Sequence, residues 1–175
     1  QTVVGSGTGV IVLVPQEWRT TIQGTYCLLT CYHNFHARDE NVPALSTVAR
    51  RAQRATVSLK HGEYDEFAVK LAPERGCCGY EDGDPHSTLD WFACALAASA
   101  YEKLAHHWVR PVQLTAERRI GVPNDIVFML GLKNGEGRVL ESPNFIESVN
   151  EDEVCTHMEA SNGCSGAPLF NDNQL

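Results

Sequence analysis

The sequence has no apolar run long enough to cross a membrane, and it has few positive charges for the number of negative ones. No stretch approaches the roughly eighteen consecutive apolar residues of a transmembrane helix. Its 14 Lys and Arg residues are outnumbered by 22 Asp and Glu residues, so the net charge is −8 at pH 7. An acidic surface repels phosphate backbones and anionic lipids. We therefore expect neither a nucleic-acid partner nor a membrane partner.

Internal repeats and low-complexity tracts are also absent, which excludes collagen and coiled-coil architectures. The first residues lack a charged segment followed by an apolar one, so the sequence predicts no signal peptide. Hydrophobic residues make up 43% of the 175 residues and charged residues 21%. These values are typical of a folded globular protein with one compact domain or two half-domains.

Paired cysteine motifs are missing, although the chain contains seven cysteines. An odd number leaves at least one thiol outside any intramolecular disulfide, and most of the cysteines lie in apolar runs such as 26–29 and 92–95. We therefore expect reduced thiols and an intracellular location, cytoplasmic or nuclear. Segments 77–78 and 155–157 contain metal-ligand residue types, but neither is a C-x-x-C pair. The sequence predicts no metal site and no cofactor.

Short strand-forming runs account for most of the chain. They lie at 10–14, 24–30, 54–60, 66–71 and 89–96 in the first half, and at 109–114, 125–132, 137–140 and 154–158 in the second. Turn residues separate these runs, with a hairpin turn expected at 61–63 and further turns at 122–125, 133–135 and 142–144. The pattern predicts an all-β protein built from two small barrels.

The predicted organisation has three parts. Residues 1–100 form an N-terminal barrel and residues 109–175 form a C-terminal barrel. Between them, residues 101–108 are a linker in which helix formers favour a short helix.

The most specific motif is the segment 162–170, Asn-Gly-Cys-Ser-Gly-Ala-Pro-Leu-Phe. Glycines at 163 and 166 allow a tight turn that exposes the hydroxyl of Ser165. The same turn points the backbone amides of Gly163 and Ser165 toward one spot, as an oxyanion hole requires. A Gly-Ser turn ahead of a strand is the plain alternative. The segment resembles the G-x-S-G-x-P motif of chymotrypsin-like serine peptidases.

A serine hydroxyl needs a base, and His33 at the end of a predicted strand is the candidate. The segment 28–35 resembles the family's L-T-A-A-H segment, with Thr30 and His33 in register. His36 is the nearest competitor, three residues farther along.

The base in turn needs a carboxylate, and two acids open predicted strands. Asp90 precedes the run 91–96 and resembles the acid of the family's D-x-A-L-L segment, whereas Asp65 precedes 66–71 next to the hairpin turn. We favour Asp90 because the family's acid follows a hairpin and opens the last strand of the first barrel; Asp65 stays as the alternative.

The resemblance implies two six-stranded antiparallel barrels with the site between them, and a serine endopeptidase acting on protein or peptide substrates. It implies Ser165 as the nucleophile, His33 as the general base and Asp90 as its partner, with the Gly163 and Ser165 amides as the oxyanion hole. Two other readings remain: an inactive, protease-like module that binds peptides, and an unrelated β-rich interaction domain.

The sequence departs from the family at several positions. Cys164 stands where digestive members have an Asp, and Asn34 stands where a half-cystine usually follows the histidine. We therefore expect no activation by N-terminal trimming, and an intracellular or virus-like branch. If Glu159 lies at the base of the specificity pocket, it would favour a Lys or Arg side chain, with His157 and Ser161 as further lining candidates. An exposed glutamate in a differently shaped loop is the alternative, which we favour.

The largest departure is at the C-terminal end of the sequence. The family continues with a strand that walls the pocket, and the chain as given stops at Leu175. We expect the second barrel to be truncated there, with the missing wall supplied by a further segment, a second chain or a second copy.

Overall fold

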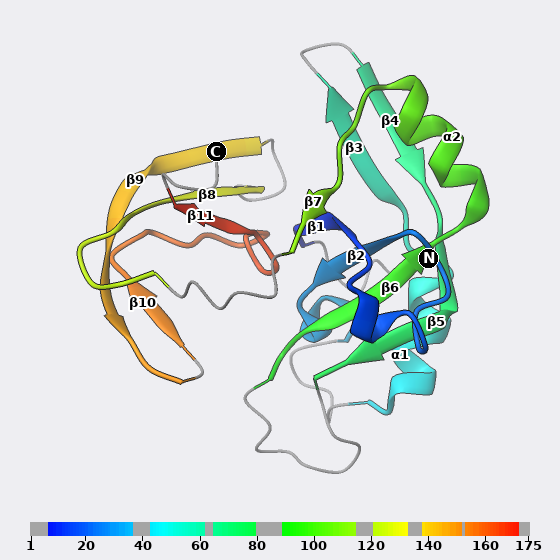
Figure 1. The fold of residues 1–175 in the computed structure, drawn as a ribbon, viewed down its shortest axis with the longest axis horizontal. Helices are drawn as coiled ribbons and strands as arrows, with labels where there is room; N and C mark the ends of the chain where they lie inside the picture. The colour runs from blue at the N-terminus through cyan, green and yellow to red at the C-terminus, as the bar shows by residue number, and fades with distance from the viewer. Residues whose placement is uncertain are drawn as a thin grey trace.

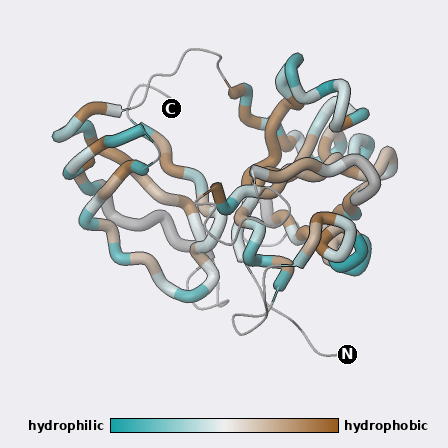
Figure 2. Tube along the Cα trace, turned by 90° about the horizontal axis from the view of Figure 1, so that it is seen from below, coloured by the Kyte–Doolittle hydropathy of each residue, from teal (hydrophilic) through white to brown (hydrophobic). Residues whose placement is uncertain are grey.

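The computed structural model describes residues 7–36, 43–61, 65–79, 89–114, 121–132, 138–151 and 153–171. Strands predominate, and they form two lobes that lie side by side in two perpendicular views (Figures 1 and 2). The predicted turn at 133–135 and the C-terminal residues 172–175 lie outside the described residues.

The larger lobe contains the first seven strands and both α-helices (Figure 1). Its elements are β1 (Gly9–Leu13), η1 (Gln16–Trp18), β2 (Tyr26–Thr30), η2 (Tyr32–Phe35), α1 (Leu45–Ala52), β3 (Val57–His61), β4 (Asp65–Val69), β5 (Leu71–Cys78), β6 (Phe92–Leu96), α2 (Ala98–His106) and β7 (Val112–Gln113). One sheet has the order β5-β6-β2-β1-β7, and β3 and β4 form a separate antiparallel pair. The hairpin expected around 61–63 is therefore present as the β3–β4 pair.

The five-stranded sheet is covered on both faces, which explains why every residue of β6 is buried. One face packs Leu28 and Phe92 against α1 and α2 through Val48 and Leu104. The other face forms a second cluster that includes Ile22 beyond η1. Figure 2 shows hydrophobic segments running through this lobe. Burial on both faces holds the ends of β2 and β6 in fixed positions.

Strand β7 extends this sheet beyond the predicted boundary between the two units. Its residue Val112 pairs with Val12 of β1 in parallel orientation. Strand β7 lies in the segment 109–175, which the sequence assigns to the C-terminal barrel. The chain thus completes the first sheet before it enters the second lobe (Figure 1).

The smaller lobe is a curled sheet with the order β10-β9-β8-β11 (Figure 1). Its strands are β8 (Ile126–Leu132), β9 (Arg138–Val149), β10 (Val154–Thr156) and β11 (Leu169–Asn171). The turn predicted at 142–144 is wrong, because these residues lie inside β9. The pairing shifts register there, with Val127 opposite Asn144 and Met129 opposite Glu141. A bulge accommodates Pro143, which has no N–H to give to a ladder.

Two other elements were not expected from the sequence. Helix α1 buries Val48 and Ala52, four residues apart on one face, which is the spacing of an amphipathic helix. Strand β5 pairs with β6 across a register shift between Ala72 and Gly76, and this irregularity hides its strand pattern. The helix expected around 101–108 is present as α2, which begins at Ala98.

Candidate active site

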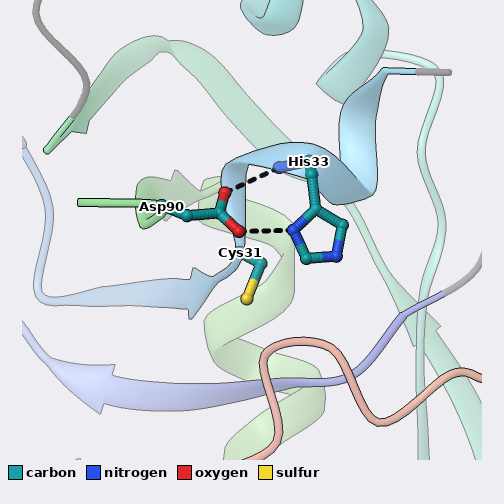
Figure 3. Close-up of side chains that lie close together, drawn as sticks. All are labelled: Cys31, His33 and Asp90. Atoms are coloured by element: carbon teal, nitrogen blue, oxygen red, sulfur yellow. Dashed lines mark hydrogen bonds and ion pairs between the residues drawn. The ribbon is translucent and has the colours of Figure 1, made fainter. Parts of the chain in front are cut away.

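His33 and Asp90 meet because β2 and β6 are neighbours in the sheet. Thr30 at the end of β2 pairs with Phe92 at the start of β6. The residues just beyond these ends, His33 in η2 and Asp90 before β6, therefore come side by side (Figure 3). One carboxylate oxygen, Oδ1, accepts the backbone N–H of His33 at 3.0 Å. The other, Oδ2, is hydrogen-bonded to Nδ1 of the imidazole.

This pairing decides which ring nitrogen of His33 is available. A carboxylate only accepts, so Nδ1 carries the proton and Nε2 is left with a lone pair. In Figure 3, Nε2 lies on the side of the ring away from Asp90. The side chains of His33 and Asp90 are 45% and 42% exposed, so a substrate can reach the ring. The arrangement suits a general base whose charged form is stabilised by a neighbouring acid.

Ser165 lies in a tight loop between β10 and β11. The amide of Cys164 donates to the carbonyl of Ser161 at 3.1 Å, and the amide of Ala167 donates to the carbonyl of Cys164 at 2.8 Å. Gly163 and Gly166 have φ values of 98° and 86°, in the region that favours glycine. The two glycines of the motif therefore have a conformational reason for their positions.

Residues of the larger lobe hold the serine loop by donating hydrogen bonds to the loop's carbonyl groups. Thr8 donates from its hydroxyl to the Gly163 carbonyl at 2.6 Å and from its amide to the Ser165 carbonyl at 2.8 Å. Asn34 donates from Nδ2 to the same Ser165 carbonyl at 3.0 Å and to the hydroxyl of Thr30 at 2.8 Å. The Thr30 hydroxyl donates in turn to the Thr8 carbonyl at 2.5 Å. Three residues of the larger lobe thus fix the serine loop against the ends of β1 and β2.

The amides of the loop are used differently. Within the described part of the chain, the N–H groups of Gly163 and Ser165 donate to no protein acceptor. The carbonyls of the same two residues are both occupied. Both amides are therefore available to an outside acceptor, which is one requirement of an oxyanion hole.

Cys31 connects the His33–Asp90 pair to the serine loop. Its thiol interacts with the Asp90 carboxylate on one side and accepts the amide of Gly166 on the other. Burial, followed by the negative charge of Asp90, raises the pKa of Cys31 to about 11. At neutral pH the group is therefore a thiol, which excludes a preformed thiolate nucleophile at this position. No disulfide joins any of the seven cysteines.

The structure shows only part of the predicted Ser165–His33–Asp90 arrangement. Both His33 and Ser165 lie in described segments, and the imidazole and the Ser165 hydroxyl form no hydrogen bond with each other. Asp65 is the first residue of β4, where it pairs with His61, and its side chain lies outside the described ones. His36 donates its amide to the carbonyl of His33 at 3.3 Å. Of the two candidate acids, Asp90 is the one seen to contact His33.

The three predicted pocket residues lie between β10 and the serine motif. His157 is exposed, with Nε2 lying 3.6 Å from Oε2 of Glu147 on β9. Glu159 is exposed as well. The Ser161 hydroxyl lies 3.6 Å from the thiol of Cys164. Their part in binding a substrate stays a prediction.

Sequence reasoning missed the residues that support the site, namely Thr8, Cys31 and Asn34. Asn34 carried a signal, because it follows His33 and stands where the family has a half-cystine, and Cys31 lies within the segment 28–35 that resembles the family. Thr8 had none, since its role depends on contacts with residues more than 150 positions away.

No protein-family model matches the chain, and no curated protein matches it. Within the described residues, none of the helices has the length and apolar character needed to cross a membrane.

Proposed function

We propose that the chain is a serine endopeptidase that hydrolyses peptide bonds in protein substrates. The observation that supports it best is the carboxylate–imidazole pair of Asp90 and His33, next to a loop that offers two amides without protein acceptors. Ser165 lies in this loop, and its carbonyl accepts a hydrogen bond from Asn34, the residue after His33.

The proposed reaction follows from the roles of these groups. The Ser165 hydroxyl attacks the substrate carbonyl while Nε2 of His33 takes its proton. The amides of Gly163 and Ser165 donate to the negative oxygen that forms, and Asp90 stabilises the imidazolium. His33 then gives the proton to the leaving amine, and a water molecule releases the acyl group by the same route.

The proposal needs a hydrogen bond that the structure lacks, between His33 and Ser165. Rotation of the Ser165 side chain about one bond would move its hydroxyl without disturbing the carbonyl contacts that hold the loop. Catalytic hydrogen bonds are often long or misaligned before substrate binds and tighten afterwards. We propose that substrate brings the two groups together.

We also propose that the two lobes correspond to the two antiparallel barrels of a chymotrypsin-like fold. Six strands, β1 to β6, precede α2, and their pairings join β1 to β2, β2 to β6, and β6 to β5. The chain passes from β4 to β5 through Lys70 alone, and we propose that the separate β3–β4 pair belongs to the same barrel. The site residues then come from both lobes, as such an architecture requires.

An inactive module that binds peptides is the second candidate. The missing hydrogen bond between His33 and Ser165 favours it, because peptide recognition needs no proton transfer. The exposed His33 and the unoccupied amides would then serve only as hydrogen-bonding groups for a peptide backbone.

Labelling with a fluorophosphonate probe separates the two candidates, since the probe reacts with activated serines only. We expect the wild-type protein to label, and Ser165→Ala and His33→Ala to lose the label. Two matched controls should label normally. They are Ser148→Ala, which removes an exposed serine on β9, and His106→Ala, which removes a histidine of α2. A folded wild-type protein that never labels would reject the peptidase and leave the binding module.

A further inference from the structure

Three metal-ligand side chains meet at the site, although the sequence predicted no metal site. The Cys31 thiol sulfur, a ring nitrogen of His33 and a carboxylate oxygen of Asp90 all lie within 4.8 Å of one another (Figure 3). Among the described residues, this is the one group of three or more Cys, His, Asp or Glu side chains close enough to hold a metal ion.

We infer that Cys31, His33 and Asp90 form a zinc site that regulates the protein. Sulfur, imidazole nitrogen and carboxylate oxygen are the three ligand types that zinc prefers in proteins. Magnesium and calcium take oxygen ligands almost exclusively, so a donor set with one sulfur and one nitrogen selects against them. Three protein ligands leave a fourth tetrahedral position for water.

The geometry needs only a small adjustment to bind the ion. Zinc–ligand distances of about 2.0–2.3 Å place tetrahedral ligands roughly 3.4 Å apart. The longest separation, of up to 4.8 Å, must therefore shorten by up to about 1.4 Å. Nδ1 of His33 and Oδ2 of Asp90 are in hydrogen-bond contact and must instead move apart to make room for the ion. Side-chain rotations supply both movements. His33 and Asp90 are nearly half exposed, so the ion can enter from solvent.

Metal binding rearranges protons in a defined way. Zinc takes the lone pair of Nδ1, so the neutral ring of His33 carries its proton on Nε2 instead. The thiol of Cys31 loses its proton to solvent as the sulfur–metal bond forms. One proton is released per ion, and no oxidant or reductant is required.

The regulatory part of this inference rests on the proposed function. A His33 ring that carries its proton on Nε2 cannot accept the proton of Ser165. Zinc binding would therefore switch off the general base without touching the serine, and removal of the ion would restore it. Cys31 has no part in the proposed acyl transfer, so its substitution separates metal binding from catalysis.

The binding test uses cobalt chloride as a spectroscopic substitute for zinc. We expect Co²⁺ to give a thiolate-to-cobalt charge-transfer band with the wild-type protein, and zinc chloride to abolish it by competition. Cys31→Ala should lose the band and weaken zinc binding at least roughly tenfold, the lower bound for outer-sphere partners of a metal. Cys155→Ala, which removes the exposed thiol of β10, is the matched control and should keep both.

A second variant covers the case in which Cys31→Ala fails to fold. Asparagine has nearly the same shape as aspartate, and Asp90→Asn should weaken zinc binding by a factor similar to that of Cys31→Ala. The charge-transfer band of Cys31 should persist in this variant, but only at higher cobalt concentration. Unchanged zinc affinity in Cys31→Ala or Asp90→Asn would overturn the inference.

The regulatory test measures fluorophosphonate labelling with and without zinc chloride. Labelling of the wild-type protein should fall at least tenfold with zinc and recover with a chelator, whereas Cys31→Ala should label equally in both conditions. A cobalt band without any labelling would reject the peptidase and keep the metal site. Labelling that zinc inhibits equally in Cys31→Ala would reject the metal site and keep the peptidase.

Discussion

Replacement of Thr30 by valine should loosen the serine loop while the fold stays intact. Thr30 is 6% exposed and is the buried polar residue of the described chain. Its hydroxyl donates to the Thr8 carbonyl and accepts from Asn34, whose amide also holds the Ser165 carbonyl. Valine has the same shape without the hydroxyl, so the change removes two hydrogen bonds and little volume.

The expected loss of stability follows from the polar groups that lose the Thr30 hydroxyl as a hydrogen-bond partner. An unsatisfied buried polar group costs about 1–3 kcal/mol. The part-buried Thr8 carbonyl loses the Thr30 hydroxyl as a donor, and Asn34 loses it as an acceptor but keeps its bond to Ser165. The free energy of unfolding should therefore fall by about 2–3 kcal/mol. Thr30→Ser keeps the hydroxyl and removes one methyl group, which costs about 1 kcal/mol. The difference between the two variants, about 1–2 kcal/mol, is the contribution of the hydrogen bonds.

Two measurements on the same pair of variants test this reasoning. Urea unfolding gives the two free energies, and the rate of fluorophosphonate labelling reports on the position of Ser165. The difference in free energy between the two variants should reflect weaker packing of the serine loop against the larger lobe. In that case Thr30→Val should label about tenfold more slowly than Thr30→Ser, because 1.36 kcal/mol corresponds to a factor of ten in rate. Equal stability and equal labelling in the two variants would show that the network does not hold the loop.

Three further predictions follow from the site and the core. Asp90→Asn should slow labelling by roughly 10³- to 10⁴-fold because His33 loses its preferred tautomer, whereas Asp65→Asn should label normally; the reverse result would make Asp65 the acid. Gly166→Ala should lower the free energy of unfolding by at least about 1–2 kcal/mol from the positive φ alone, and its β-carbon would also collide with the Thr8 carbonyl; thermal unfolding at the wild-type temperature would contradict this. Burial raises the pKa of Cys27 from 9.0 to about 12, so the unfolded chain releases this proton at lower pH than the folded one. The contribution of the Cys27 thiol to stability should be constant below pH 9 and fall between pH 9 and 12 by up to about 1.4 kcal/mol per unit. A urea series in which Cys27→Ala shows the same slope as the wild type would refute it.

Local patterns predicted the elements that carry the site. Strand-forming runs predicted β1, β2, the β3–β4 pair and β6, because their apolar residues are contiguous along the chain. The register between β2 and β6 was not predictable in the same way. It depends on which strands become neighbours, and that pairing places Asp90, rather than Asp65, against His33.

The errors have a common origin in long-range contacts. The expected turn at 142–144 is overridden because β8 pairs with β9 on both sides of a bulge. Helix α1, which has Arg50 and Arg51 in its last turn, forms where its apolar face packs on the larger lobe. In both places the tertiary partner decides the local conformation.

The sequence by itself determined the β-rich character of the chain, the helix after β6 and the candidate residues His33, Asp90 and Ser165. These depend on runs of neighbouring side chains and on glycines that permit a positive φ at 163 and 166. Tertiary structure alone decided that Thr8 and Asn34 hold the serine loop, and that Cys31 joins His33 and Asp90. Such contacts arise when segments far apart in the chain pack together, and no spacing along the chain records the distance between them.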